Sequence, residues 1–371
     1  MGKTILKLIF VGLLLYVFLV SIGLMGEAFK GFGKGFAENL LNTTSNPFVG
    51  LFVGILATSL VQSSSTTTSI VVGMVASGVL TVSGAIPIIF GANIGTTVTN
   101  TLVALGHISR REEFKRAIAG ATVHDFFNLM CVAIFFPIEL ATGFLEKFAT
   151  GLAGLFVDFG GLKFTSPIKI ITKPTIHFLE HLHTDHLPFS NTVNYTLVFV
   201  TSFILIYIAL FYIVKVMRSL VIDKTESVFN DIIGKSSLIG IAAGLIFTVF
   251  VQSSSITTSI LVPMIAAGII TIETAFPITL GANIGTTATA MLASFALGNP
   301  AAVTIAFVHL LFNCLGVLFI FPIHAVRRIP IRLAQGLGEL AYKNRSIAFF
   351  YVFGLFFVLP GILILISKML N

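Results

Sequence analysis

The sequence GLFVGILATSLVQSSSTTTSI, at residues 50–70, returns 190 residues later as GIAAGLIFTVFVQSSSITTSI, at residues 240–260. The heptapeptide GANIGTT follows at the same offset in both copies, at residues 91–97 and 281–287. A third pair follows at an offset of 185, with HDFFN at residue 124 and HLLFN at residue 309. The chain therefore contains an internal repeat, which indicates two related structural units.

The composition around this repeat is that of a membrane protein. Hydrophobic residues make up 56% of the 371 residues and charged residues only 10%, against about 25% charged residues in ordinary soluble domains. Apolar stretches at residues 8–25, 193–214 and 347–366 exceed the roughly 18 residues that can cross a bilayer as a helix. The net charge of +7 comes from Lys and Arg in short segments between apolar stretches. This pattern is typical of cytoplasmic membrane loops and does not indicate a nucleic-acid partner.

The charges of two equivalent loops predict how the repeats are oriented. The loop before HDFFN carries Arg110, Arg111, Lys115 and Arg116, whereas the equivalent loop at residues 297–302 carries no charge. Short basic loops stay in the cytoplasm, so we expect the two loops on opposite sides and the repeats in inverted orientation. This topology places the N-terminus in the cytoplasm and the C-terminus outside the plasma membrane.

The lengths of the apolar segments distinguish membrane crossings from hairpins. The two segments that flank each QSSS motif contain about 14 or 15 residues, so each helical arm spans only about 22 Å. We therefore predict a re-entrant hairpin in each repeat, with QSSS at its tip. The glycines and asparagine of GANIG favour local unwinding, so we expect the helices at residues 85–105 and 275–297 to be interrupted there. The predicted fold class is an all-α polytopic membrane protein with about seven full crossings.

These elements predict six consecutive parts of the chain. They are an N-terminal transmembrane helix and external linker at 1–46, inverted repeat 1 at 47–145, an external loop at 146–192, a transmembrane helix and cytoplasmic linker at 193–236, inverted repeat 2 at 237–325, and a cytoplasmic interfacial segment with a C-terminal transmembrane helix at 326–371.

The paired QSSS and GANIGTT motifs are the candidate binding site. Small polar residues often only let membrane helices pack closely, and that explanation suits isolated positions such as Ser77 and Thr248. Four consecutive polar residues cannot all face one neighbouring helix. Their recurrence in both halves therefore predicts a substrate site where the repeats meet.

The residues that these motifs lack indicate what the site binds. Neither polar centre contains Lys or Arg, so an anionic ligand would be held by hydroxyls, an amide and N–H groups at half-helix starts, which we expect at Thr66 and Ile256. The oxygens of Asn and Thr in GANIGTT suit a small cation. An anion accompanied by alkali cations satisfies both, and this predicts an ion-coupled symporter without an organic or metal cofactor.

The sequence resembles the type II sodium-dependent phosphate cotransporters. The resemblance rests on VQSSSTTTSIVVGMVASGVLTVSGAIPIIFGANIGTTVTNTLVAL, on EFKRAIAGATVHDFFN and PIELATGFLE, and on the second VQSSS and GANIGTT motifs. It extends over residues 47–360 and implies sodium-driven uptake of inorganic phosphate by alternating access, with sodium as co-substrate. It also implies a compact prokaryotic-type member, because the external loop is short and lacks cysteine, and because the chain ends at Asn371.

The resemblance assigns roles to individual residues. The implied phosphate-binding residues are Gln62, Ser63, Ser64, Ser65, Thr66, Gln252, Ser253, Ser254 and Ser255. The implied sodium neighbours are Asn93, Thr96, Thr97, Asp125, Gln252, Ser253, Asn283, Thr286 and Thr287.

Asp125 is a separate candidate because it breaks the symmetry of the repeats. Leu310 occupies the matching position in the second repeat. Carboxylates inside a membrane are costly unless paired, and bound sodium is a suitable partner. The alternative is a carboxylate that is hydrogen-bonded to neighbouring Ser, Thr or Asn side chains. By resemblance, an aspartate after this histidine is a feature of the electrogenic relatives, so we expect electrogenic transport.

Three other functions remain open from the sequence. A passive anion channel could use similar hydroxyl-lined centres, and a sodium-coupled carrier of sulfate or a dicarboxylate could share the architecture, although a dicarboxylate carrier would be expected to show an arginine. A membrane hydrolase is disfavoured, because no acid–base constellation is apparent. The expected partners are therefore phosphate, sodium and the lipid bilayer, and the sequence does not predict the oligomeric state.

Overall fold

The computed structural model describes residues 2–33, 35–36, 38, 41, 44–158, 167–185, 188–232 and 236–370. The described chain is helical, without β-strands. The helices are α1 (Gly2–Gly31), α3 (Pro47–Val61), α4 (Ser64–Ala76), α5 (Val82–Gly95), α6 (Val98–Leu105), α7 (Arg111–Thr142), α8 (Phe144–Asp158), α9 (Pro167–Thr184), α10 (Asn191–Ile232), α11 (Ser237–Val251), α12 (Ser254–Ala266), α13 (Ile272–Leu297), α14 (Pro300–Ile320), α15 (His324–Lys343), α16 (Ser346–Phe353), the π-helical η1 (Gly354–Val358) and α17 (Leu359–Leu370).

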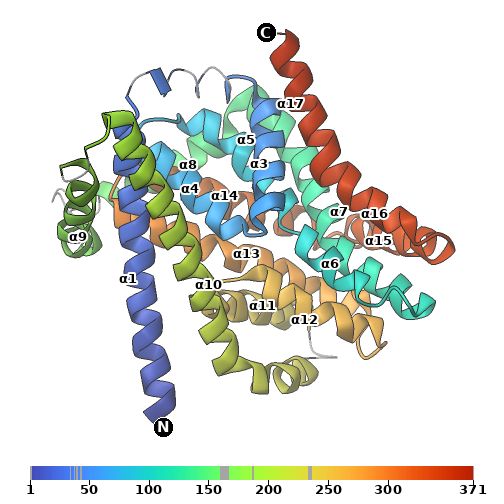
Figure 1. Cartoon of the computed structure of the whole chain (residues 1–371). Helices are drawn as coiled ribbons and strands as arrows, with labels where there is room; N and C mark the ends of the chain where they lie inside the picture. Colours follow the sequence, from blue (N-terminus) through green and yellow to red (C-terminus); the bar gives the residue numbers. More distant parts are fainter. Residues whose placement is uncertain are drawn as a thin grey trace.

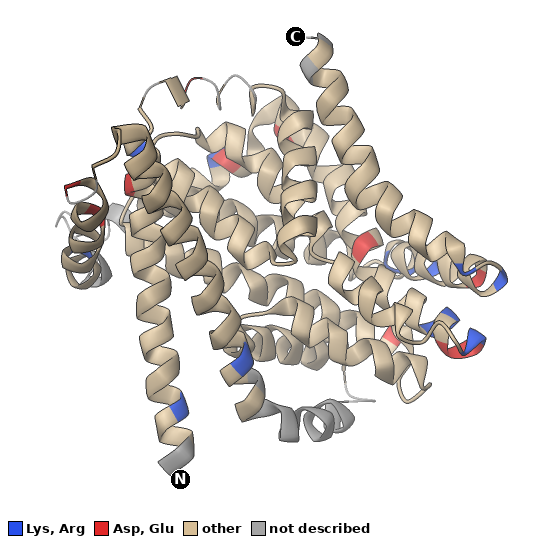
Figure 2. Cartoon of the chain, viewed as in Figure 1, with Lys and Arg blue, Asp and Glu red and all other residues tan. Residues whose placement is uncertain are grey.

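The described helices confirm the predicted class of an all-α protein with seven candidate membrane spans. The spans are Thr4–Gly31, Val82–Leu105, Arg111–Thr142, Asn191–Met217, Ile272–Leu297, Pro300–Ile320 and Ser346–Ser367. The four shorter apolar helices are α3, α4, α11 and α12, which are the arms of the two predicted hairpins. In Figure 2, Lys and Arg lie at helix ends and along α15, while the central helices are almost free of them. The chain is an integral membrane protein.

Both copies of the repeat produce the same order of elements. A hairpin of two short helices is followed by a GANIGTT helix and a long helix, in α3–α7 and again in α11–α14. In Figure 1 the first hairpin lies in the upper half of the molecule and the second in the lower half. Helices α1 and α10, which belong to neither copy, pack along each other at one side. The orientation of the repeats relative to a bilayer stays a prediction.

Glycine contacts hold each hairpin against its GANIGTT helix. A Cβ atom on Gly91 of α5 would lie 2.0 Å from the carbonyl oxygen of Leu51 in α3. In the second copy, a Cβ atom on Gly281 of α13 would lie 1.9 Å from the carbonyl oxygen of Ile241 in α11. Backbones approach this closely only where small residues such as glycine lie at the contact. These glycines therefore allow direct backbone packing of α3 on α5 and of α11 on α13.

The prediction of an interrupted GANIGTT helix in each copy is confirmed in the first copy and wrong in the second. In the first copy the break between α5 and α6 lies at Thr96 and Thr97, after the last glycine. In the second copy α13 runs without a break from Ile272 to Leu297. The glycines serve packing in both copies: a Cβ atom on Gly285 would lie 2.7 Å from the Cβ atom of Thr248, and one on Gly95 would lie 2.6 Å from the carbonyl oxygen of Ile55. Close packing of this kind is compatible with an unbroken helix, so the glycines alone do not require unwinding.

The predicted external loop contains two helices, α8 and α9, within its described residues. Glu139, near the end of α7, explains where α8 begins. Its carboxylate accepts hydrogen bonds from the backbone N–H groups of Leu145, at 2.6 Å, and Glu146, at 3.2 Å. These groups belong to the first turn of α8 and have no partner within the helix.

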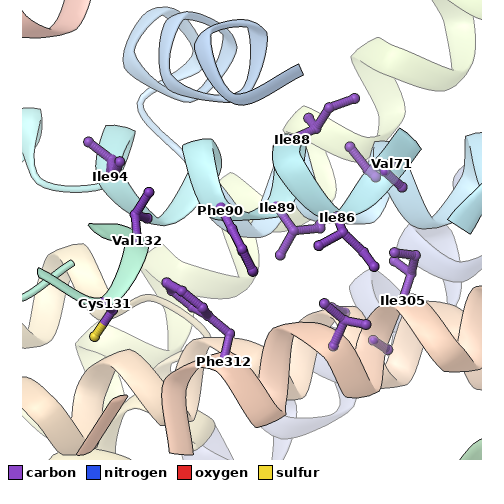
Figure 3. Packing of buried hydrophobic residues seen from close by; sticks show 14 of the residues in the cluster. Val71, Ile86, Ile88, Ile89, Phe90, Ile94, Cys131, Val132, Ile305 and Phe312 are labelled. Atoms are coloured by element: carbon purple, nitrogen blue, oxygen red, sulfur yellow. The ribbon is translucent and has the colours of Figure 1, made fainter. Parts of the chain in front are cut away.

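The hydrophobic core lies where the two copies meet. Phe90 of α5 stacks on Phe312 of α14, with ring centroids 4.4 Å apart, and both rings are fully buried. Figure 3 shows these rings facing each other between α5 and α14, with Ile86 and Ile305 further along the same contact. The core therefore joins the repeats directly and positions the polar motifs on either side.

We expect Gly91→Ala to destabilise the protein, because its methyl group would meet a backbone oxygen that cannot move aside. Overpacking of this kind costs about 1–3 kcal/mol, although alanine is intrinsically better than glycine in a helix. Gly151→Ala in α8 is the matched control, because nothing lies within 4 Å of its added Cβ atom. Thermal unfolding in detergent should show a lower Tm for Gly91→Ala only. Equal Tm values would contradict the close contact.

Candidate functional site

Each hairpin reverses direction at a glutamine with a left-handed backbone. Gln62 has a φ of 57° and Gln252 a φ of 59°, and they are the two non-glycine residues with positive φ in the described chain. Their N–H groups donate to the carbonyl oxygens of Thr58, at 2.8 Å, and Thr248, at 2.7 Å. This backbone conformation costs roughly 1–3 kcal/mol for a residue with a side chain. Glycine would be the usual choice at such a helix end, so a role for the glutamine side chain is indicated.

The two glutamine side chains make matching hydrogen bonds. Gln62 Oε1 accepts from the hydroxyl of Thr99 in α6 at 2.9 Å, and Gln252 Oε1 accepts from Thr289 in α13 at 2.9 Å. The amide nitrogen of Gln62 donates to the carbonyl oxygen of Ser59. Each amide therefore joins the turn of a hairpin to its GANIGTT helix.

The serine after each glutamine caps the second arm of the hairpin. Ser63 Oγ accepts from the N–H of Thr66 at 3.2 Å, and Ser253 Oγ accepts from the N–H of Ile256 at 3.4 Å. As a result α4 and α12 begin at Ser64 and Ser254, two residues earlier than the half-helix starts predicted at Thr66 and Ile256. The second and third serines of each QSSS motif thus occupy the first helical turn.

A single cavity of about 180 Å³ joins the two hairpin tips. All nine predicted phosphate-binding residues line it: Gln62, Ser63, Ser64, Ser65, Thr66, Gln252, Ser253, Ser254 and Ser255. Helix α10 closes it with Tyr207, Leu210, Phe211 and Val214. None of these lining residues is charged. The structure therefore brings the two QSSS motifs together, although 190 residues separate them in the chain.

The predicted sodium neighbours in GANIGTT lie outside the lining of this cavity. Each threonine hydroxyl donates to its own helix: Thr96 to Ala92, Thr97 to Ile94, Thr286 to Ala282 and Thr287 to Ile284. A hydroxyl that donates in this way keeps lone pairs that can bind a cation. All four threonines are buried.

The two motif asparagines lie in a buried network that crosses between the copies. Asn93 Oδ1 and His309 Nε2 are 3.3 Å apart, and Asn283 Nδ2 donates to Asn128 Oδ1 at 3.0 Å. In addition, Asn128 donates to the carbonyl oxygen of Asn93 and Asn313 to that of Asn283, both at 2.8 Å. The HDFFN and HLLFN motifs therefore hold the GANIGTT helices in place.

Asp125 is fully buried on α7, 14 residues after this helix begins at Arg111. Tyr351 of α16 donates a hydrogen bond to Asp125 Oδ2 at 2.9 Å, whereas Oδ1 has no hydrogen-bond partner among the described residues. Thr97 faces this carboxylate but donates to Ile94 at 3.0 Å. A buried carboxylate with one open oxygen is a candidate cation ligand.

The chain matches the model of a known protein family. The profile described as Na+/Pi-cotransporter matches residues 17–165 and 205–340, which is more than half of the chain. This chain belongs to the Na+/Pi-cotransporter family.

Curated relatives agree with this family. Sodium-dependent phosphate transport protein 2B of Pongo abelii is 36% identical over 448 aligned positions, which cover 97% of this chain and 64% of that protein. The 2A protein of Ovis aries is 37% identical, covering 97% of this chain and 67% of that protein, and the 2A protein of Rattus norvegicus is 35% identical, covering 99% and 68%. The chain thus spans about two thirds of the length of these relatives. No solved structure matches it significantly.

Several residues at the site of this member of the cotransporter family were not predicted from the sequence. Thr99 and Thr289 could have been found, because the repeat continues past GANIGTT as TTVT and TTAT. No sequence pattern marks Tyr351, because it lies in an apolar helix and is 226 residues away from its hydrogen-bond partner Asp125. Tyr207 and its neighbours in α10 likewise belong to an apolar stretch outside both copies.

We expect Gln62→Gly and Gln252→Gly to keep or raise the Tm, whereas the corresponding alanine variants should lower it. Both substitutions lose the side-chain amide hydrogen bonds, but glycine adopts the left-handed backbone without strain and so offsets that loss, whereas alanine keeps the strain. Thermal unfolding of the four purified variants tests this difference. A lower Tm for glycine than for alanine would show that the turn is not strained.

Proposed function

We propose that this protein is a sodium-coupled symporter of inorganic phosphate that works by alternating access. The observation that carries this proposal is the cavity in which the two QSSS tips face each other. Two equivalent helix starts from the two copies converge on one small polar volume. Such a site at a repeat interface is the arrangement expected of a secondary transporter. The relatives named as sodium-dependent phosphate transport proteins support the same substrates.

The chemistry of the cavity suits a phosphate ion. The N–H groups of Ser64 and Ser254 open α4 and α12 and have no carbonyl oxygen of their own helix to bond with. The positive ends of both helices therefore point toward the ligand. Serine hydroxyls and the glutamine amides add groups that can donate to phosphate oxygens or accept from a protonated one.

The sodium ions are proposed to bind beside this cavity. Gln252 and Ser253 would contact both phosphate and sodium, while the oxygens of Asn93, Thr96, Thr97, Asn283, Thr286 and Thr287 are the further candidate ligands. Asp125 would add a cation site in the first copy alone. We place the protein in the plasma membrane with a cytoplasmic N-terminus and an external C-terminus, on the basis of the loop charges.

Uptake of radiolabelled phosphate into proteoliposomes tests the proposal. An inward sodium gradient should drive phosphate above its equilibrium level, whereas potassium or choline should not, because the uncharged cavity needs cations to accept a divalent anion. Gln252→Gly should abolish this uptake while remaining folded. The control Ser202→Ala removes a hydroxyl of α10 that bonds only to its own helix, and should transport normally. Flux that runs only downhill would indicate a channel, and preferred uptake of sulfate would reassign the substrate.

We expect Asp125→Gly to keep sodium-dependent phosphate uptake but to lose its response to membrane potential. Removing the carboxylate removes one negative charge and the cation that would balance it, so the charge moved in each cycle changes. The measurement is uptake under potassium diffusion potentials set with valinomycin. Tyr351→Phe is the control, because it removes the hydrogen bond to Asp125 and keeps the carboxylate; its uptake should stay voltage-sensitive. An unchanged voltage response in Asp125→Gly would remove Asp125 from the coupling mechanism.

A further inference from the structure

A second polar cavity lies far from the hairpin tips, beside the amphipathic helix α15. It has a volume of about 350 Å³, within the roughly 300–1,000 Å³ typical of small-molecule sites. Its polar lining comes from three elements: Ser236 and Ser237 at the start of α11, Glu273 and Thr274 at the start of α13, and His324, Arg327 and Arg328 of α15. None of these residues lines the cavity between the QSSS tips.

The two arginines in this cavity are unpaired in the described part of the chain. Neither Arg327 nor Arg328 makes an ion pair or a side-chain hydrogen bond there. Other basic side chains near α15 are satisfied: Lys115 pairs with Glu339, and Arg116 donates to the carbonyl oxygen of Ala266 at 2.8 Å. Two neighbouring guanidinium groups without an acceptor are a suitable receptor for an anion.

Contacts around the arginines leave their donors available. The guanidinium carbon of Arg327 lies 4.9 Å from the ring centre of Phe321, so one face rests on the ring while its edge can donate. The single carboxylate of the lining, Glu273, accepts a hydrogen bond from Gln335 at 3.1 Å. With histidine neutral, two arginines and one glutamate leave the lining with a net positive charge.

The position of α15 indicates where such an anion comes from. Ile329 and Leu333 are 44% and 46% exposed on α15; Ile329 directly follows Arg328, and Leu333 directly follows Arg332. An amphipathic helix with exposed aliphatic and basic residues lies at the surface of a bilayer. Basic pockets between membrane helices at that depth bind phospholipid headgroups.

We propose that this cavity binds the phosphate ester of an anionic lipid headgroup, held by Arg327 and Arg328. The bound group would bridge α15 to the first turns of α11 and α13, which begin the second hairpin and its GANIGTT helix. Lipid composition would then influence the copy that carries Gln252 and Asn283. This site is independent of the transport site and does not rest on the proposed substrate.

Native mass spectrometry of the purified full chain tests the proposal with phosphatidylglycerol as the probe and phosphatidylcholine as the zwitterionic reference. The wild-type protein should retain phosphatidylglycerol preferentially. The double variant Arg327→Gln, Arg328→Gln should weaken this binding roughly tenfold or more, because charge-assisted hydrogen bonds are lost. Arg332→Gln is the matched control: it removes one positive charge from an exposed position of the same helix that does not line the cavity.

Several results would overturn the proposal. Equal loss of phosphatidylglycerol in Arg332→Gln would mean that the helix attracts anionic lipid diffusely, and equal retention of both lipids would mean that no such site exists. The single variant Arg328→Gln keeps the test valid if the double variant misfolds, because it leaves the contact between Arg327 and Phe321 intact. This variant should also weaken the binding of phosphatidylglycerol. A parallel experiment with inorganic phosphate identifies the source of the bound phosphate group. If millimolar phosphate displaces the lipid, the occupant of the cavity is soluble phosphate and not a lipid headgroup.

Discussion

The turn at the tip of each hairpin is the constraint on which the site depends. A chain that reverses direction in an apolar surrounding must hydrogen-bond the backbone groups at the turn, because no bulk water is available to them. Gln62 and Gln252 meet this requirement through left-handed backbones whose N–H groups bond to Thr58 and Thr248, and the following serines cap the next helix. The first N–H groups of α4 and α12 have no acceptor within their own helices, and Ser64 and Ser254, which carry them, line the shared cavity. Satisfying the turn thus brings two helix starts to the site proposed for the anion.

Departures from the repeat symmetry are as informative as the symmetry itself. Asn100 of α6 accepts hydrogen bonds from Thr258, at 2.9 Å, and Ser259, at 3.2 Å, in the second hairpin. The position of Asn100 in the second copy is Ala290, which cannot accept such bonds from its side chain. Asp125 is likewise unmatched, since Leu310 takes its place. The paired tips therefore suit the anion proposed to bind between them, while the unmatched residues distinguish the two halves and would bias the order of events in the proposed transport cycle.

The sequence predicted the hairpins and their tips because both follow from local rules. Arms that are too short to cross a bilayer must turn back, and four consecutive polar residues mark the turn. The continuity of α13 was not predictable by those rules, because glycines permit either unwinding or close packing, and the same glycine packing accompanies a break in the first copy and an unbroken helix in the second. The bond between Tyr351 and Asp125 joins distant parts of the chain, and the α10 wall of the cavity uses ordinary apolar residues. Neither the bond between Tyr351 and Asp125 nor the α10 wall is marked by a sequence pattern from which it could have been predicted.

The absence of charge from the described lining of the tip cavity gives a physical reason for the proposed coupling of phosphate to sodium. A divalent anion loses much of its hydration on entering a cavity of about 180 Å³ whose lining is neutral, and several kcal/mol of desolvation per ion must be offset. Serine hydroxyls and helix starts offset part of this free energy, since each supplies a partial charge. A lysine or arginine there would complete the neutralisation permanently, and phosphate could then enter without a companion ion. Because the described lining supplies no such residue, the proposed transport would depend on mobile cations for neutralisation, and a sodium gradient would then be the source of energy for uptake.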